Sequence, residues 1–316
     1  MFTTTRRARG EPSAPSALGP LPVAIPPPDS ETVAPGEGVP PRGRRAARRT
    51  PTAGVVVGPS GIAVAVVGYE GEQPDILETV ELYTRLDEPA SFGPALATVL
   101  RAAVRQLDIP GASVTLGLAH RDVSFQVAYV PLLARRPSRV LRTRAGATDR
   151  NLLIRSWPAP WFPERDHERP VLAVRSPRWL VKAAQRAARR ARVHLAGIEP
   201  VGFALLRAFS TRLGSADTLV VEQWGGTTTA AISSGGHPVL SLTTGEDDVV
   251  GFIGGVVDAY ARLAPESSVT RVELAGPGTS AWSAQVEAQL GVSAVSVLAP
   301  GCPSLAAFGL GIADAR

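Results

Sequence analysis

Two glycine-rich turns, one near each end of the patterned part of the chain, carry residue types that bind phosphate. The first is 58–61 (Gly-Pro-Ser-Gly) and the second is 225–228 (Gly-Gly-Thr-Thr). Each lies between short apolar runs, which predicts a strand, a turn of small residues and a second strand. Glycine lets the backbone approach a phosphate closely, and consecutive backbone amides form an anion-binding nest. Two similar turns are what a protein needs to hold a nucleotide phosphate between two lobes.

The elements around the second turn follow a regular order along the chain. Apolar periodicity over 217–316 predicts the order β-β-β-α-β-α-β-α, with strands at about 217–223, 228–233, 238–243, 270–275 and 294–298 and helices at 248–263, 280–290 and 304–314. The chain from residue 54 opens in the same order, with extra segments between its elements. Ser176 and Pro177 are typical of an N-cap and a first helical residue, so a helix is expected to begin there. Two copies of one order predict a duplicated α/β fold with a cleft between the halves.

Composition narrows the class of protein. The 316 residues are 44% hydrophobic with a mean hydropathy of +0.08, which is enough for two folded units. No apolar run reaches the ~20 residues needed to cross a bilayer. Cys302 is the single cysteine, which excludes an intrachain disulfide and fits a reducing, cytosolic compartment. The four histidines lack metal-ligand spacing, so a zinc site is not expected.

Two regions are rich in arginine. Residues 1–50 contain eight arginines against four acidic residues, with many Pro, Ala and Gly residues, and are predicted to be a disordered arm. Such an arm could contact nucleic acid or anionic lipid, or remain a solvated tail. The stretch 132–156 is also strongly basic, and Trp157 and Trp161 lie nearby. Nucleic acid could use that mixture, but a solvated helix face followed by a proline-rich loop is the preferred interpretation.

Four passages of the chain occur in a recognisable order. Residues 125–131 (Phe-Gln-Val-Ala-Tyr-Val-Pro) predict a strand that ends in proline, and 170–205 predict a strand, a helix and an Ala-Gly-Ile-Glu-Pro passage. Residues 271–278 predict a strand ending in Gly-Pro-Gly, and 306–310 (Ala-Ala-Phe-Gly-Leu) predict a closing helix. In this order and spacing the chain resembles the PilM family of type IV pilus assembly proteins, within the actin-like ATPase superfamily.

The resemblance implies an actin-like fold of two duplicated RNase H-like lobes. The first lobe would span 51–213, with a small inserted subdomain at about 110–170, and the second would span 214–316. It also implies ATP as the cofactor, with the 276–278 turn beside the adenosine. The implied partner is the cytoplasmic tail of an inner-membrane protein similar to PilN, bound in a groove beside the inserted subdomain. The protein would then be cytoplasmic and peripheral to the inner membrane.

The chain departs from the family where phosphate chemistry is done. Aligned on the first turn, the family's Asp is Val56 and its Lys is Ala63, while Glu222 is the nearest counterpart of the Asp of the second turn. Trp224 stands where a small residue is expected. A valine cannot organise Mg²⁺ and its water shell, so Mg²⁺ is doubtful and efficient hydrolysis is not expected. No catalytic residue or metal ligand is assigned. The residues through which nucleotide binding could persist are Gly58, Ser60, Gly61, Glu222, Gly225, Gly226, Thr227, Thr228, Gly276 and Gly278.

The sequence therefore predicts a PilM-like cytoplasmic scaffold of a type IV pilus or a type II secretion-like assembly, with weak or absent ATP hydrolysis. One alternative is an active ATPase or kinase of the same fold, in which Glu222 would supply the metal-linked carboxylate. Another is a nucleic-acid or anionic-lipid binder that works through the arginine-rich arm, with nucleic acid the less favoured ligand.

Overall fold

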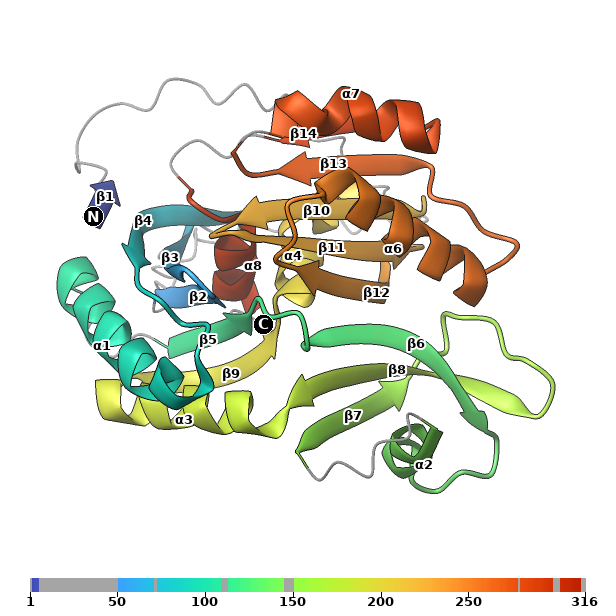
Figure 1. Cartoon of the computed structure of the whole chain (residues 1–316), viewed down its shortest axis with the longest axis horizontal. Coiled ribbons are helices and arrows are strands. Elements are labelled where there is room, and N and C mark those ends of the chain that lie inside the picture. The colour runs from blue at the N-terminus through green and yellow to red at the C-terminus, as the bar shows by residue number, and fades with distance from the viewer. Residues whose placement is uncertain are drawn as a thin grey trace, which may run out of the picture.

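The computed structural model describes residues 2–5, 51–70, 73–108, 113–144, 151–277, 279–297 and 302–313. They form two sheets whose broad faces are covered by helices (Figure 1). The six-stranded sheet has the order β1-β4-β3-β2-β5-β9, and the eight-stranded sheet has the order β14-β13-β10-β11-β12-β6-β8-β7.

The first lobe contains three antiparallel strands followed by two parallel ones. Its strands are β2 (Thr52–Gly58), β3 (Gly61–Glu70), β4 (Gln73–Tyr83), β5 (Ser113–Leu118) and β9 (His194–Pro200). Helices α1 (Pro89–Leu107) and α3 (Arg178–Ala191) cover one face, because each has an apolar stripe at helical spacing. The strands β2 and β3 are buried along most of their length, as their runs of Val, Ala and Ile predict.

The second lobe repeats this arrangement. Its strands are β10 (Thr218–Trp224), β11 (Thr227–Ser234), β12 (His237–Thr244), β13 (Arg271–Ala275) and β14 (Ala294–Val297). Its helices are α6 (Val249–Leu263), α7 (Thr279–Leu290) and α8 (Leu305–Ala313). The predicted order β-β-β-α-β-α-β-α is confirmed, and corresponding strands occupy corresponding places in the two sheets.

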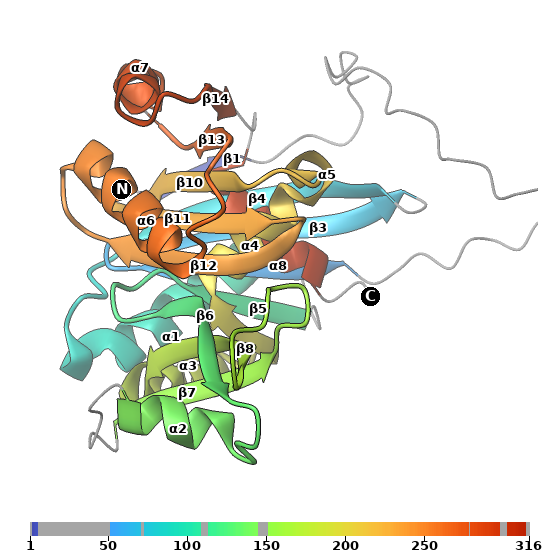
Figure 2. The same cartoon turned by 90° about the vertical axis from the view of Figure 1, so that its right-hand side faces the viewer.

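The segment inserted after β5 extends the sheet of the other lobe. Strand β6 (Ser124–Pro131) pairs with β12 through Leu240↔Gln126 and Ser241↔Phe125. Strands β8 (Glu168–Pro177) and β7 (Leu152–Pro158) follow it outward, and α2 (Pro137–Arg144) packs on β7 and β6. Figure 2 shows α2 at the end of the molecule opposite α7.

Two helices lie between the sheets and join the lobes. Helix α4 (Val201–Ala208) packs against β11 and β12, whereas α8 packs against β2, β3 and β5, and the two helices pack on each other (Figure 1). A short helix, α5 (Ser210–Leu213), follows α4. The backbones approach closely: a Cβ added at Gly54 would lie 1.9 Å from the Ala307 carbonyl oxygen, and one at Gly309 would lie 1.9 Å from that of Ala204. The lobes are therefore joined by an interface that admits no larger residue at these glycines.

Two local features differ from expectation. Strand β8 continues to Pro177, which pairs with Leu152, so α3 begins at Arg178 and the predicted N-cap at Ser176 is wrong. The strand pairing extends two residues further than the local capping signal suggested. Within the predicted arm, residues 2–5 form β1 (Phe2–Thr5), which pairs with β4; residues 6–50 lie outside the described part of the chain.

Candidate functional site

The two predicted phosphate turns meet at their tips. Gly225 and Gly226 have φ of +59° and +75°, a backbone that glycine adopts easily and that closes the β10–β11 hairpin in two residues. The hydroxyl of Ser60, in the β2–β3 turn, donates a hydrogen bond of 2.5 Å to the carbonyl oxygen of Gly225. The two hairpins therefore contact each other directly, at the place where a phosphate would separate them.

Trp224 occupies the space beside this contact. Its side chain is buried, and a Cβ at Gly58 would lie 3.0 Å from the indole ring. The indole Nε1 donates a 2.7 Å hydrogen bond to the Glu81 carboxylate on β4. The residue that the sequence flagged as too large for the second turn thus bridges the two lobes.

Glu222 caps a helix. One carboxylate oxygen accepts from the Leu305 backbone amide at 2.5 Å and the other accepts from the Ser304 hydroxyl at 3.0 Å; the Ala306 amide also contacts both oxygens. These groups begin α8, whose free amides and positive dipole end favour a carboxylate. Burial nevertheless raises the pKa of Glu222 to about 7, against the lowering effect of these hydrogen bonds. Its oxygens are occupied by the protein itself.

A cavity of about 360 Å³ remains between the lobes next to these residues. It is lined by Glu81, Tyr83, Glu222, Trp224, Gly225, Gly276, Pro277, Val297, Cys302, Pro303 and Leu305. This lining contains two carboxylates and neither lysine nor arginine. Among the described residues, no group of three or more His, Cys, Asp or Glu side chains is arranged to hold a metal ion.

The remaining predicted residues serve the turns themselves. The Thr227 hydroxyl donates to the Trp224 carbonyl oxygen at 2.8 Å within the hairpin, and Thr228 is buried. Gly61 and Gly276 allow backbones to pass: a Cβ there would lie 2.1 Å from the carbonyl oxygens of Leu82 and Gln223, respectively. Gly278 lies outside the described residues. The structure thus brings Gly58, Ser60, Gly61, Gly225, Gly226 and Thr227 to the hairpin tips and places Glu222 and Gly276 at the cavity.

A larger groove, of about 600 Å³, lies between the inserted strands and the first lobe. Its floor consists of three cross-strand pairs of β7 and β8: Leu153↔Ser176, Arg155↔Val174 and Trp157↔Leu172. Its walls come from α3, from Phe203 of α4 and from β9, whose residues 195–200 all face it. Within the described residues, β9 pairs only with β5 and forms one edge of its sheet. The groove therefore combines a mostly apolar floor with a strand edge that can pair.

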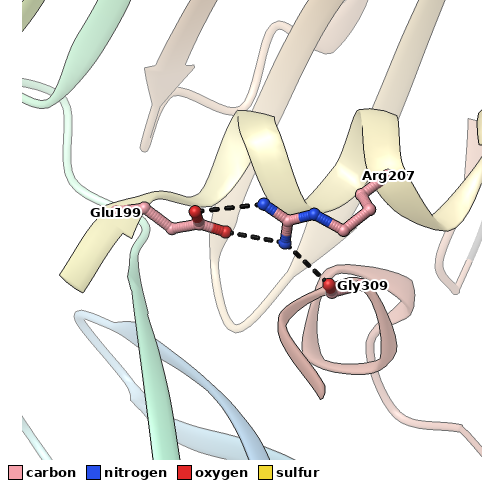
Figure 3. Close-up of polar contacts among 3 residues, drawn as sticks. All are labelled: Glu199, Arg207 and Gly309. Carbon is pink, nitrogen blue, oxygen red and sulfur yellow. Dashed lines mark hydrogen bonds and ion pairs between the residues drawn. The ribbon is translucent and has the colours of Figure 1, made fainter. Parts of the chain in front are cut away.

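An ion pair fixes the end of this groove (Figure 3). Both terminal nitrogens of Arg207 bond the Glu199 carboxylate, at 2.9 and 3.1 Å, and Nη1 also donates to the Gly309 carbonyl oxygen at 2.8 Å. The three residues belong to α4, β9 and α8. Sequence reasoning missed this cluster, because a Glu and an Arg eight residues apart across a strand–helix junction give no recognisable pattern.

The fold and the paired hairpins define the class of protein: an actin-like α/β protein of two duplicated lobes. No family model matches the chain, and no curated protein matches it in sequence. Several solved structures do match the chain, by fold. The PilM-PilN type IV pilus biogenesis complex superposes with a TM-score of 0.65 and 16% identity, over 83% of this chain and 97% of the other.

Two further structures are similar. A Bacteroides thetaiotaomicron protein with an actin-like ATPase fold and unknown function gives a TM-score of 0.53 at 10% identity, over 84% of this chain and 97% of its own. The cytoplasmic domain of EpsL, an inner-membrane component of the type II secretion system of Vibrio cholerae, gives a TM-score of 0.49 at 12% identity, over 84% of this chain and 94% of its own. At these identities the first two comparisons establish the actin-like fold. Among the described helices, none has the length and apolar character that a membrane crossing requires.

The actin-like ATPase fold suggests a nucleotide as the ligand to test against the cleft, and the residues present do not fit a nucleoside triphosphate. The Ser60–Gly225 contact and the Trp224 ring fill the space between the turns. The adjoining cavity offers the Glu81 carboxylate, which would repel phosphate, and no described lining residue is cationic. The two turns have the form of a phosphate clamp, and the Ser60–Gly225 hydrogen bond and the Trp224 ring occupy the space between them.

Proposed function

We propose that this protein is a PilM-like scaffold of a type IV pilus or type II secretion-like assembly, and that its groove binds the cytoplasmic tail of a membrane partner similar to PilN. The observation that carries the proposal is the groove itself, in which the open edge of β9 lies beside an apolar floor. An extended peptide can add to such an edge through its backbone, while alternate side chains enter pockets. The similarity to the PilM-PilN complex supports this assignment.

The groove also offers anchors for side chains. Trp157 is 48% exposed although it is large and apolar, and aromatic residues of this kind dominate binding energies at interfaces. Arg155 is exposed beside it and can pair with an acidic residue of the tail. Because the cleft does not fit a triphosphate, the scaffold is proposed to work without ATP turnover, at the cytoplasmic face of the inner membrane.

The test is calorimetry of the full chain with synthetic peptides that match the N-terminal cytoplasmic tails of bitopic inner-membrane proteins from the same genome. One peptide should bind, and Trp157→Ala should weaken it about tenfold or more. Tyr83→Ala is the matched control, because Tyr83 is also 48% exposed but lines the cleft between the lobes. A copy of the peptide with alternate N-methylated amides should lose binding if the backbone pairs with β9. Binding that Trp157→Ala leaves intact would refute the groove assignment.

A further inference from the structure

The turn between β6 and α2 presents two leucines to solvent. Leu132 is 46% exposed and Leu133 is 94% exposed. The turn is firmly held: the Leu132 amide donates to the His167 carbonyl oxygen, and the Arg169 guanidinium donates to the Ala134 carbonyl oxygen, both at 3.0 Å. Leu133 therefore projects from a fixed backbone, and its side chain is almost fully exposed among the described residues.

Three arginines follow these leucines closely in the chain. Arg135, Arg136 and Arg139 are exposed and line two shallow hollows of about 480 and 580 Å³. None of the three forms an ion pair with a carboxylate in the described part of the chain, whereas Arg144, on the same helix, lies 2.7 Å from Glu168. The result is a compact cationic surface whose charge is not neutralised by its described neighbours.

We propose that this Leu-Arg tip, defined as residues 132–136 together with Arg139, docks on a bilayer that contains anionic lipid. Leucines at the tip enter the boundary between headgroups and acyl chains, and the arginines bind the lipid phosphates. The combination favours this ligand over single-stranded nucleic acid, which is bound by aromatic side chains on which bases stack, because the tip has none.

The position of the tip gives docking a consequence. The tip adjoins α2, at the end of the molecule opposite α7 (Figures 1 and 2), and α2 packs on β7, a strand of the groove floor. A docked tip would hold the groove near the membrane from which a partner's tail emerges. That consequence rests on the proposed function, whereas lipid binding by the tip does not.

The first experiment is cosedimentation of the full chain with vesicles of phosphatidylcholine alone or mixed with phosphatidylglycerol, without any partner peptide. The triple variant Arg135→Gln/Arg136→Gln/Arg139→Gln should lower the partition coefficient for anionic vesicles about a hundredfold, since each arginine near such a surface contributes about fivefold. The control, Arg186→Gln/Arg189→Gln/Arg190→Gln, removes the same charge from exposed positions of α3. It should lose only a few fold. Equal losses in the two variants would overturn the proposal, because binding would then follow total charge.

The second experiment tests the leucine. Leu133→Ser should weaken binding to anionic vesicles about tenfold, while Leu77→Ser, at a 43% exposed leucine on β4, should leave it unchanged. A polarity-sensitive dye on Leu133→Cys, in a Cys302→Ala background, should shift to the blue when anionic vesicles are added. An unshifted dye on bound protein would refute insertion. If the triple arginine variant loses oligonucleotide binding and keeps vesicle binding, the tip would be assigned to nucleic acid instead. Because no partner peptide is present, each result is independent of the groove.

Discussion

The hydroxyl of Ser60 lies 2.5 Å from the carbonyl oxygen of Gly225, so a residue of the first hairpin is hydrogen-bonded to the turn of the second. In a phosphate clamp these two turns would be separated by the ligand. Here the protein makes the contact itself, and the Trp224 indole, bonded to Glu81, lies beside it. The two lobes are thus held together at the position where a nucleotide would otherwise join them.

The first prediction concerns nucleotide. Neither ATP nor Mg-ATP at millimolar concentration should change the melting temperature of the protein, because a ligand stabilises a fold only in proportion to its binding. Differential scanning fluorimetry with and without Mg²⁺ measures this. The matched control is inorganic phosphate at the same ionic strength, which corrects for salt effects. A rise of several degrees with Mg-ATP alone would show that the turns open to admit phosphate.

The fold was predictable because its signals are local and repeated. Runs such as 55–57 and 219–221 are apolar on both faces, as central strands require, and α1 has its apolar residues at helical spacing. The pairing of β6 with β12 was not predictable, since it rests on two residue pairs that join segments more than a hundred residues apart. Sequence periodicity defines which face of a strand is buried, but not which strand lies next to it.

The site was predictable only in its residue types. The turn glycines do lie at facing hairpin tips, but the sequence does not show that Ser60 would bond across to Gly225, 165 residues away. Glu222 is a strand-end carboxylate in sequence, and its partners at the start of α8 lie 82 to 84 residues further on. The first contact depends on how the two hairpins meet, and the second on where α8 begins. A residue's chemistry can be identified from sequence, whereas its partner is determined by the tertiary structure.

Glu222 should make stability depend on pH. Burial raises its pKa from 4.5 to about 7, so the folded chain holds this proton more tightly than the unfolded chain does. The resulting stabilisation is complete below about pH 4.5 and is lost as the pH rises through about 7. Relative to Glu222→Gln, the wild-type free energy of unfolding should fall by up to about 3 kcal/mol from about pH 4.5 to about pH 8, since one pKa unit corresponds to about 1.4 kcal/mol.

Urea unfolding of both proteins across this range measures the difference, and subtraction removes the contribution of the other titrating groups. The glutamine variant suits the comparison because its amide oxygen can still accept from the Leu305 amide. A wild-type curve that runs parallel to the variant's would mean that Glu222 keeps the same protonation in the folded and unfolded chains.

The Arg207–Glu199 pair should stabilise the junction between the lobes. Both side chains are 22% exposed, and Arg207 also bonds Gly309. Arg207→Met should cost about 2 kcal/mol, because it removes charge-assisted hydrogen bonds and leaves a half-buried carboxylate unpaired. Glu199→Gln should cost less, since Arg207 keeps its bond to the Gly309 carbonyl.

The control is Arg85→Met, which breaks the exposed pair of Arg85 and Asp87 at 3.6 Å and should cost less than about 1 kcal/mol. A double-mutant cycle between positions 199 and 207 isolates the coupling. Additive costs in that cycle would contradict a direct interaction between the two side chains.

Gly54 should be among the most sensitive of the described glycines. Its position on β2 faces α8, where a Cβ would lie 1.9 Å from the Ala307 carbonyl oxygen and 2.5 Å from the Gly311 amide nitrogen. Both are backbone atoms, so the helix itself would have to move away from the sheet. Gly54→Ala should therefore cost about 3 kcal/mol or more in the free energy of unfolding.

Gly255→Ala is the matched control, because this glycine is exposed in the interior of α6 and a Cβ there would meet nothing within 4 Å. That substitution should stabilise the protein by about 0.5–1 kcal/mol through helix propensity. Chemical denaturation measures the free energy of unfolding of both variants, which should fall for Gly54→Ala and rise for Gly255→Ala. A tolerated alanine at position 54 would show that α8 does not pack against β2 at this distance.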